Sequence, residues 1–514
     1  MEAAGALGRG SLSTWAEGLR EAVRSRSRTF WIVAGLTAVA AALRFATLGV
    51  QSYHHDEIVT ASRILRDGFW HAMSAVGFSE SAPPLYYALA WAWTQLTGTG
   101  EFGLRSISAL AGVATVPVAF LLGAELRDRR AGIAAAALVA VNPMLLWYSQ
   151  EARAYSLFAL LTALSALYFV RALDCGRRRD FVGWGIASAL ALATHYFAVF
   201  PIAVEALWLL RRRGKDTVPG LWIVGLAGLA LAPLAIHQMS IGHAEWIGHF
   251  PLVHRLWAAA VTFTIGETGD IIARPERPLL GVFPLALIAL ALGLLVARGD
   301  KRERRGAGIA LVLGAATVAV PLVLALVSPG KDFVLARNLL PALVPLLVAV
   351  AIGVSLQGAR RSGALLGVLL VAYSLGFCIW ASVSPALQRP DWSGVAAKLG
   401  EPTAPRAMVT WTLGEASLRY YLSTGSFQVS PSDGLDWLVG EVDFISDGPA
   451  PPVPAKTLGP GFRQASYEQV GGRLYIRRYK FSGPGLAPLR LRAIRGADLG
   501  FRTNGVLLDG IGPQ

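Results

Sequence analysis

Long apolar runs alternate with short basic segments through most of this chain. Apolar windows recur between residues 30 and 383, and many of them approach the length of about 20 residues that a helix needs to cross a bilayer. The segments between them carry clusters of Arg and Lys, among them "RDRR" (127–130), "RRRGK" (211–215) and "KRERR" (301–305). Such clusters are typical of cytoplasmic loops. The pattern therefore predicts an α-helical polytopic membrane protein.

Placing the basic clusters in the cytoplasm predicts about eleven crossings. We expect them at residues 30–48, 104–125, 131–149, 154–173, twice within 181–210, and at 218–237, 277–297, 306–328, 338–356 and 363–383. The first outer loop then covers residues 49–82, and a further outer loop covers 238–276. Residues 83–96 ("PPLYYALAWAWTQL") also have a helical composition. A full crossing there would put the later basic clusters outside, so we expect this segment to be re-entrant or interfacial.

The two ends of the chain differ from this middle region. Residues 1–29 are polar and are expected to form a cytoplasmic segment before a retained first helix. Residues 30–385 form the predicted membrane domain. From 386 to 514, Pro, Gly, Asp and Ser become more frequent, and alternating stretches such as "RAMVTWT" and "GRLYIRRY" predict strands. We expect a small extracytoplasmic soluble α/β domain there; the alternative is a cytoplasmic tail, and the number of crossings decides between them.

Composition supports the membrane assignment and limits the kinds of binding partner that we expect. Hydrophobic residues make up 54% of the chain and charged residues only 16%, against about 25% charged in a soluble domain. The net charge of +14 is distributed over the loop clusters, so a nucleic-acid partner is not expected. The two cysteines, Cys175 and Cys378, lie in dissimilar segments and predict neither a disulfide framework nor a metal site.

Ionisable side chains gather in the predicted outer loops, where they are candidates for chemistry. Asp56 and Glu57 follow the first apolar run directly, in "QSYHHDEIV". A carboxylate can act as a base or bind a cation, and Arg can donate two parallel hydrogen bonds to phosphate. Each candidate also has a structural interpretation: a solvated loop for the acids, an ion pair with Glu151 or a lipid anchor for Arg153, and a core histidine for His195. The other polar groups predicted on this side are Glu80, Arg105, Tyr196, Lys331 and Arg337.

These residues lie within an ordered set of motifs that resembles a known family. The set comprises "HHDE", "APPLYYALAW", "NPMLLWYSQEARAYSLFALL", "ATHYFAVF", "ARNLLPALVPLL" and "RPDWSGVAAKL". Their order is similar to that in bacterial family 39 glycosyltransferases of the GT-C superfamily, whose relatives include protein O-mannosyltransferases and the lipid A aminoarabinose transferase. The resemblance implies a plasma-membrane enzyme that moves a sugar from a polyprenyl-phosphate carrier to a glycan, lipid or protein acceptor on the outer face.

The resemblance also implies roles for individual residues. It makes Asp56 the general base, with Glu57 beside it, and it puts Glu151, Arg153 and Arg337 on the donor side. By their charge, Arg105 and Lys331 are further candidates for the donor phosphate. The remaining residues expected to bind or position substrates are Glu80, Tyr155, His195 and Tyr196. Many relatives have Asn or His shortly before the "PPLYY" prolines; here either Glu80 substitutes or that contact is absent.

No cofactor is certain. A divalent cation held by Asp56, Glu151 and His195 is compatible with their ligand chemistry, although no spacing resembles a zinc motif. His54 and His55 stay open between cation ligands and ordinary interfacial residues. A carboxylate base and a phosphate leaving group predict a single displacement that inverts the anomeric carbon.

Two other functional classes are compatible with a polytopic chain. A lipid or sugar transporter or flippase would also be polytopic, but transporters tend to place ionisable residues near the bilayer midplane in broken helices, whereas here they gather in outer loops. A noncatalytic membrane scaffold is the third possibility, and the acid pair and the arginines argue against it.

Overall fold

The computed structural model describes residues 9–65, 68–241, 247, 250–267, 278–327, 333–422, 427–429, 436–490, 494 and 503–509. The chain divides into two compact units. Unit 1 comprises Met1–Ala46, Val76–Tyr86 and Ser106–Cys378, and unit 2 comprises Thr47–Ala75, Tyr87–Arg105 and Ile379–Gln514. Lys331 lies outside the described residues, so its predicted role stays a prediction.

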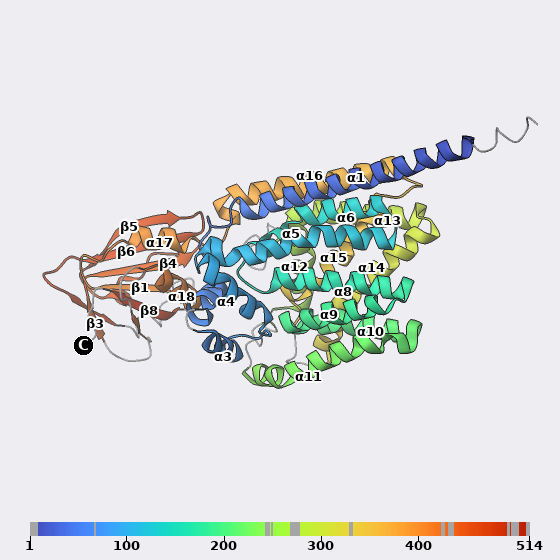
Figure 1. The fold of residues 1–514 in the computed structure, drawn as a ribbon. Helices are drawn as coiled ribbons and strands as arrows, with labels where there is room; N and C mark the ends of the chain where they lie inside the picture. Colours follow the sequence, from blue (N-terminus) through green and yellow to red (C-terminus); the bar gives the residue numbers. More distant parts are fainter. Residues whose placement is uncertain are drawn as a thin grey trace, which may run out of the picture. The chain divides into compact units, whose positions relative to one another are not determined.

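Unit 1 is helical (Figure 1). Most of its long helices are strongly apolar. A helix satisfies its own backbone hydrogen bonds, which is what a segment in lipid requires. The helices that lie wholly or mainly in this unit are α1 (Arg9–Phe45), α5 (Glu101–Leu126), α6 (Arg129–Val141), α7 (Pro143–Ser149), α8 (Tyr155–Cys175), α9 (Arg178–Thr194), α10 (Val199–Arg213), α11 (Val218–Ile241), α12 (Leu252–Ile265), α13 (Pro278–Arg298), α14 (Lys301–Val327), α15 (Leu343–Val354) and α16 (Arg360–Val383).

Eight helical runs among the described residues are long and apolar enough to cross a membrane, and α6 with α7, bent by 56°, makes a ninth. One of the eight runs from Tyr196 to Ile241 and contains both α10 and α11. Counting α10 and α11 separately and adding the 17-residue α9 gives the predicted eleven. The multi-spanning helical architecture is therefore confirmed. The 13 residues of α4 (Leu85–Thr97) are too few to cross, as expected for the "PPLYY" segment.

Two glycines show why α10 and α11 count as separate crossings. A Cβ on Gly220, in the first turn of α11, would lie 2.6 Å from the carbonyl oxygen of Phe181, in the first turn of α9. A Cβ on Gly185 would lie 2.8 Å from the Cα of Gly220. Only glycine permits so close an approach of two backbones. Because α9 and α11 begin side by side, α10 must return the chain between them.

Unit 2 contains a mixed sheet with helices α17 (Trp392–Leu399) and α18 (Thr412–Tyr421). The six-stranded sheet has the order β2-β8-β1-β4-β6-β5, in which β1 and β4 are parallel and the other neighbours antiparallel. Strands β3 and β7 form a separate antiparallel pair. The strands are β1 (Arg406–Trp411), β2 (Phe427–Val429), β3 (Asp436–Val439), β4 (Glu441–Asp447), β5 (Phe462–Val470), β6 (Leu474–Phe481), β7 (Ala487–Arg490) and β8 (Thr503–Asp509).

Both faces of this sheet are buried. Met408 and Ile445 pack with Trp392 of α17 and Leu418 of α18 on one face, and alternate residues such as Val409 pack on the other. The predicted α/β character is confirmed, with "RAMVTWT" in β1 and "GRLYIRRY" in β6. The remaining helices that lie wholly or partly in unit 2 are α2 (His55–Val59), α3 (Phe69–Ser79), α4 and α19 (Ala455–Leu458). The domain boundaries and the side of each loop stay predictions.

Candidate active site

In unit 2, the adjacent acids of the first loop have opposite surroundings. Both lie in the first turn of α2, a position that favours negative charge. Neighbouring residues on a helix point in different directions. The Asp56 side chain keeps 26% of its surface exposed, whereas that of Glu57 keeps none. Only Asp56 is therefore open to an incoming hydroxyl group.

Glu57 is held by a buried arginine. Its two carboxylate oxygens accept hydrogen bonds from Nε and Nη2 of Arg105, at 2.7 and 2.8 Å. Glu57 also accepts the backbone N–H of His54 at 2.8 Å, and Nε of Arg389 lies 3.8 Å from its Oε2. These contacts fix the turn that carries Asp56.

The structure gives Arg105 a different role from the predicted one. Besides its two bonds to Glu57, it donates to the backbone oxygens of Leu48, Gln51 and Ser52 at 2.7 to 3.1 Å. A guanidinium has five N–H donors, and all five are used here. A donor phosphate could bind Arg105 only by breaking this set, so we assign Arg105 to positioning of the first loop.

The same loop is tied to the C-terminal part of unit 2. The hydroxyl group of Ser52 donates to Oδ1 of Asp391 at 3.1 Å and accepts the backbone N–H of Ser393 at 3.0 Å. The Tyr53 backbone N–H donates to the Tyr421 hydroxyl oxygen at 2.7 Å, and that hydroxyl donates to Glu101 at 2.7 Å. None of these residues was predicted to belong to the site, although the "RPDW" motif contains Arg389 and Asp391.

His54, His55 and Asp56 form a group that could hold a metal ion. One ligand atom from each lies within 4.8 Å of the others, and Nε2 of His55 is 3.4 Å from Oδ1 of Asp56. Two imidazoles and a carboxylate suit zinc and similar divalent cations. The predicted metal set of Asp56, Glu151 and His195 draws on both units and stays a prediction.

Lowering the pH from 7 to 5 should destabilise the folded protein through His54. Burial lowers the pKa of His54 well below 6.5, His55 and Arg389 lower it further, and Asp56 and Glu57 oppose them. The unfolded chain takes up this proton near pH 6.5 and the folded chain does not, so stability is lost as the pH falls below that value. Unfolding midpoints measured across this range should fall less steeply in His54→Gln than in wild type. If the unfolding midpoints of both proteins fall equally steeply with pH, His54 is not held neutral in the folded protein.

In unit 1, Arg153 pairs with Glu80 and so joins two of the sequence motifs. Nη1 and Nη2 of Arg153 lie 3.0 and 2.6 Å from the two oxygens of Glu80. The Arg153 carbonyl oxygen accepts the Ser108 hydroxyl at 3.3 Å, and Ser108 contacts the Tyr86 hydroxyl of "PPLYY" at 3.3 Å. Glu80 is therefore the acid that holds Arg153. The Arg153 side chain keeps 13% of its surface exposed.

Tyr196 acts on the same region through a buried glutamine. Its hydroxyl donates to Oε1 of Gln238 at 2.8 Å. Nε2 of Gln238 donates to the backbone oxygens of Val76 and Ala82, at 2.9 and 3.2 Å. Those two residues bracket Glu80, so Tyr196 and Gln238 fix the segment that presents it. Gln238 was not among the predicted residues.

His195 lies in an aromatic setting just beyond the end of α9. Its ring stacks on Phe158 at 4.5 Å, and Tyr155 lies 6.0 Å away. Burial, with the nearby charges of Arg337 and Arg153, lowers the pKa of His195 to about 3. Its Nδ1 accepts the Phe197 N–H at 3.3 Å, so Nε2 carries the proton of the neutral ring. A metal ion at His195 would therefore have to replace this hydrogen bond or the proton on Nε2.

The remaining predicted residues of unit 1 are Glu151, Tyr155 and Arg337. Glu151 and Tyr155 are buried, and the backbone oxygen of Glu151 accepts the Arg153 N–H at 2.8 Å. Arg337 lies at the start of η5 (Ala336–Ala342) and is partly exposed. Unit 1 thus gathers Glu80, Arg153, His195 and Arg337, and unit 2 holds Asp56 and Glu57.

Residues 81–237 match the model of the dolichyl-phosphate-mannose-protein mannosyltransferase family. This segment contains "PPLYY", "SQEAR" and "THYF" but neither Asp56 nor Arg337. Over these residues, the match confirms the resemblance that the ordered motifs predicted. The search of curated proteins gave no significant match.

Several solved structures have low similarity to the chain. The oligosaccharyltransferase AglB of Archaeoglobus fulgidus is 14% identical, with a TM-score of 0.46 over 78% of this chain and 60% of that one. ArnT of Cupriavidus metallidurans is 15% identical, with a TM-score of 0.40 over 88% and 98%. The mycobacterial arabinofuranosyltransferase AftD is 15% identical, with a TM-score of 0.46 over 88% and 40%. The chain thus spans about three fifths of the archaeal oligosaccharyltransferase.

Proposed function

We propose that this chain, which matches a mannosyltransferase family over residues 81–237, is a membrane glycosyltransferase. It takes a sugar from a polyprenyl-phosphate carrier and transfers it to a hydroxyl group of a glycan, lipid or protein on the outer face of the plasma membrane. The N-terminus is then cytoplasmic and the C-terminal domain extracytoplasmic. The observation that carries the proposal is the pair of adjacent acids, of which one is buried in an ion pair and the other is partly exposed.

Asp56 is the general base in this proposal. Its carboxylate takes the proton of the acceptor hydroxyl as the oxygen attacks the anomeric carbon, and the bond from that carbon to the carrier phosphate breaks. A phosphate leaving group carries its own negative charge, so it needs positive charge and no proton donor. Arg153 and Arg337 supply that charge, and Lys331 remains a candidate for the same role.

The reaction type can be tested with purified protein in lipid vesicles and a panel of polyprenyl-phosphate sugars. We expect one donor to be consumed, with release of polyprenyl phosphate and a product of inverted anomeric configuration. The configuration can be read by NMR of the product. Movement of an intact carrier lipid between leaflets without cleavage would favour the transporter or flippase. A product with retained configuration would contradict the single displacement by Asp56.

A further inference from the structure

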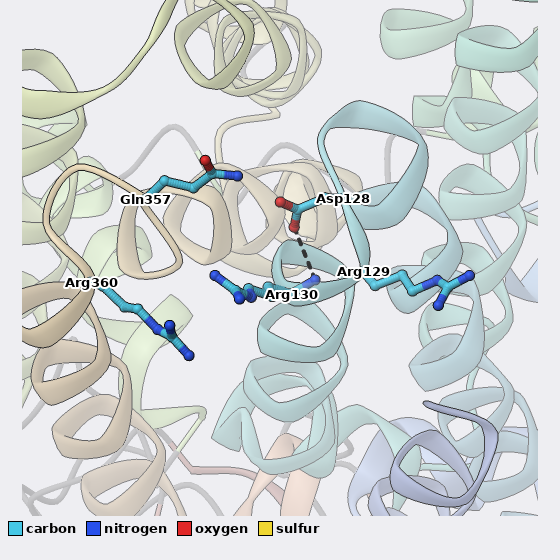
Figure 2. A pocket seen from close by; sticks show the side chains of 5 residues that line it. All are labelled: Asp128, Arg129, Arg130, Gln357 and Arg360. Atoms are coloured by element: carbon cyan, nitrogen blue, oxygen red, sulfur yellow. Dashed lines mark hydrogen bonds between the residues drawn. The ribbon is translucent and has the colours of Figure 1, made fainter. Parts of the chain in front are cut away.

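A basic pocket lies in unit 1 where the turn between α5 and α6 meets the turn between α15 and α16 (Figure 2). It has a volume of about 490 Å³ and is lined by Asp128, Arg129, Arg130, Gln357 and Arg360. The first turn carries "RDRR" (127–130) and the second carries "ARR" (359–361), both basic clusters of the kind predicted to be cytoplasmic. None of the residues assigned to the proposed reaction lines the pocket, so the proposed function does not account for it.

The two walls of the pocket are joined by one buried acid. Oε1 of Glu303, in the first turn of α14, lies 3.5 Å from Nη2 of Arg127 and accepts the backbone N–H of Gln357 at 3.1 Å. α14 also packs tightly on the end of α5, because a Cβ on Gly306 would lie 2.3 Å from the Leu126 carbonyl oxygen. The pocket is therefore framed by backbone that is fixed before any ligand arrives.

The charge in the pocket is not neutralised from within. The Asp128 carboxylate caps α6 by accepting the backbone N–H groups of Arg130 and Ala131 at 2.9 and 3.0 Å. Within the described part of the chain, neither the Arg130 nor the Arg360 guanidinium has an ion pair or a side-chain hydrogen bond. Both side chains are exposed, and both extend into the same opening, whereas Arg129 points to the other side (Figure 2).

We propose that this pocket binds a phosphate group through Arg130 and Arg360, with Gln357 as a further donor. A guanidinium donates bidentately to phosphate and keeps its charge at any physiological pH. Basic pockets between membrane helices on the cytoplasmic side are suited to phosphate headgroups. The phosphate belongs either to an anionic lipid or to a soluble phosphate compound, and the binding chemistry is the same for both.

The test compares the double variant Arg130→Gln/Arg360→Gln with wild type in nanodiscs. Phosphatidylcholine discs alone form the baseline; one arm adds phosphatidylglycerol and another adds inorganic phosphate. The readout is the unfolding temperature, titrated against each anion. The matched control is Arg211→Gln/Arg212→Gln, which removes the same charge from exposed arginines at the end of α10.

We expect a saturable rise in the unfolding temperature of wild type and control, and about tenfold or more weaker binding in the pocket variant. A response to phosphatidylglycerol alone would identify a lipid headgroup, and a response to inorganic phosphate would identify a soluble source. Equal loss in both double variants would show a diffuse charge effect and overturn the proposal. An unchanged response in the pocket variant would overturn it too.

Discussion

Replacing Glu57 by Gln is expected to lower the free energy of unfolding by about 3 to 5 kcal/mol, because the change leaves a buried arginine without its counter-charge. Arg105 and Glu57 both lie almost wholly out of solvent. Gln keeps the size of the side chain but not the charge that balances the guanidinium. The effect can be measured from chemical unfolding of the protein in detergent micelles.

Two variants separate the loss of charge from loss of packing. Asp56→Asn makes the same acid-to-amide change at the partly exposed neighbouring residue. It should alter the unfolding free energy by less than about 1 kcal/mol. Glu57→Gln/Arg105→Met removes both members of the pair and should cost less than the sum of the two single changes, since neither is then left without the other. A Glu57→Gln protein that unfolds at the wild-type midpoint would refute the structural role of the pair.

Much of the architecture could be predicted because it depends on local pattern. Apolar runs and basic clusters predicted the crossings, and alternating residues predicted β1 and β6. The end of α10 and the start of its short connection to α11 carry "RRRGK" (211–215), a clear signal in the sequence. The approach of Gly185 to Gly220, by contrast, depends on which helices become neighbours. No local pattern shows that.

The roles within the candidate site were harder to predict, because they depend on residues far apart in the chain. Glu57 and Arg105 are 48 positions apart, and nothing in "HHDE" shows which acid turns inward. Arg153 pairs with Glu80, which lies 73 positions away in the chain and could not be singled out from the sequence. Arg105 was predicted to bind phosphate because the sequence shows its charge. The sequence does not show the five oxygen atoms that accept its N–H groups. The "RPDW" motif was the available signal for Arg389.

Asp56→Asn is expected to lower the rate of sugar transfer by roughly 100- to 10,000-fold, the usual contribution of a general base. Asn keeps the shape of the side chain but cannot accept the hydroxyl proton. The fold should survive, since the Asp56 side chain is partly exposed and the buried ion pair of the turn belongs to Glu57. Binding of the donor should also survive, because the proposed phosphate ligands are arginines elsewhere in the chain.

The most direct measurement is therefore the initial rate of sugar transfer by Asp56→Asn beside wild type, at saturating donor and with the unfolding midpoint of each sample recorded. The account predicts a rate at least about 100-fold below wild type in a protein that unfolds at the wild-type midpoint. A folded Asp56→Asn protein that transfers sugar at the wild-type rate would contradict it.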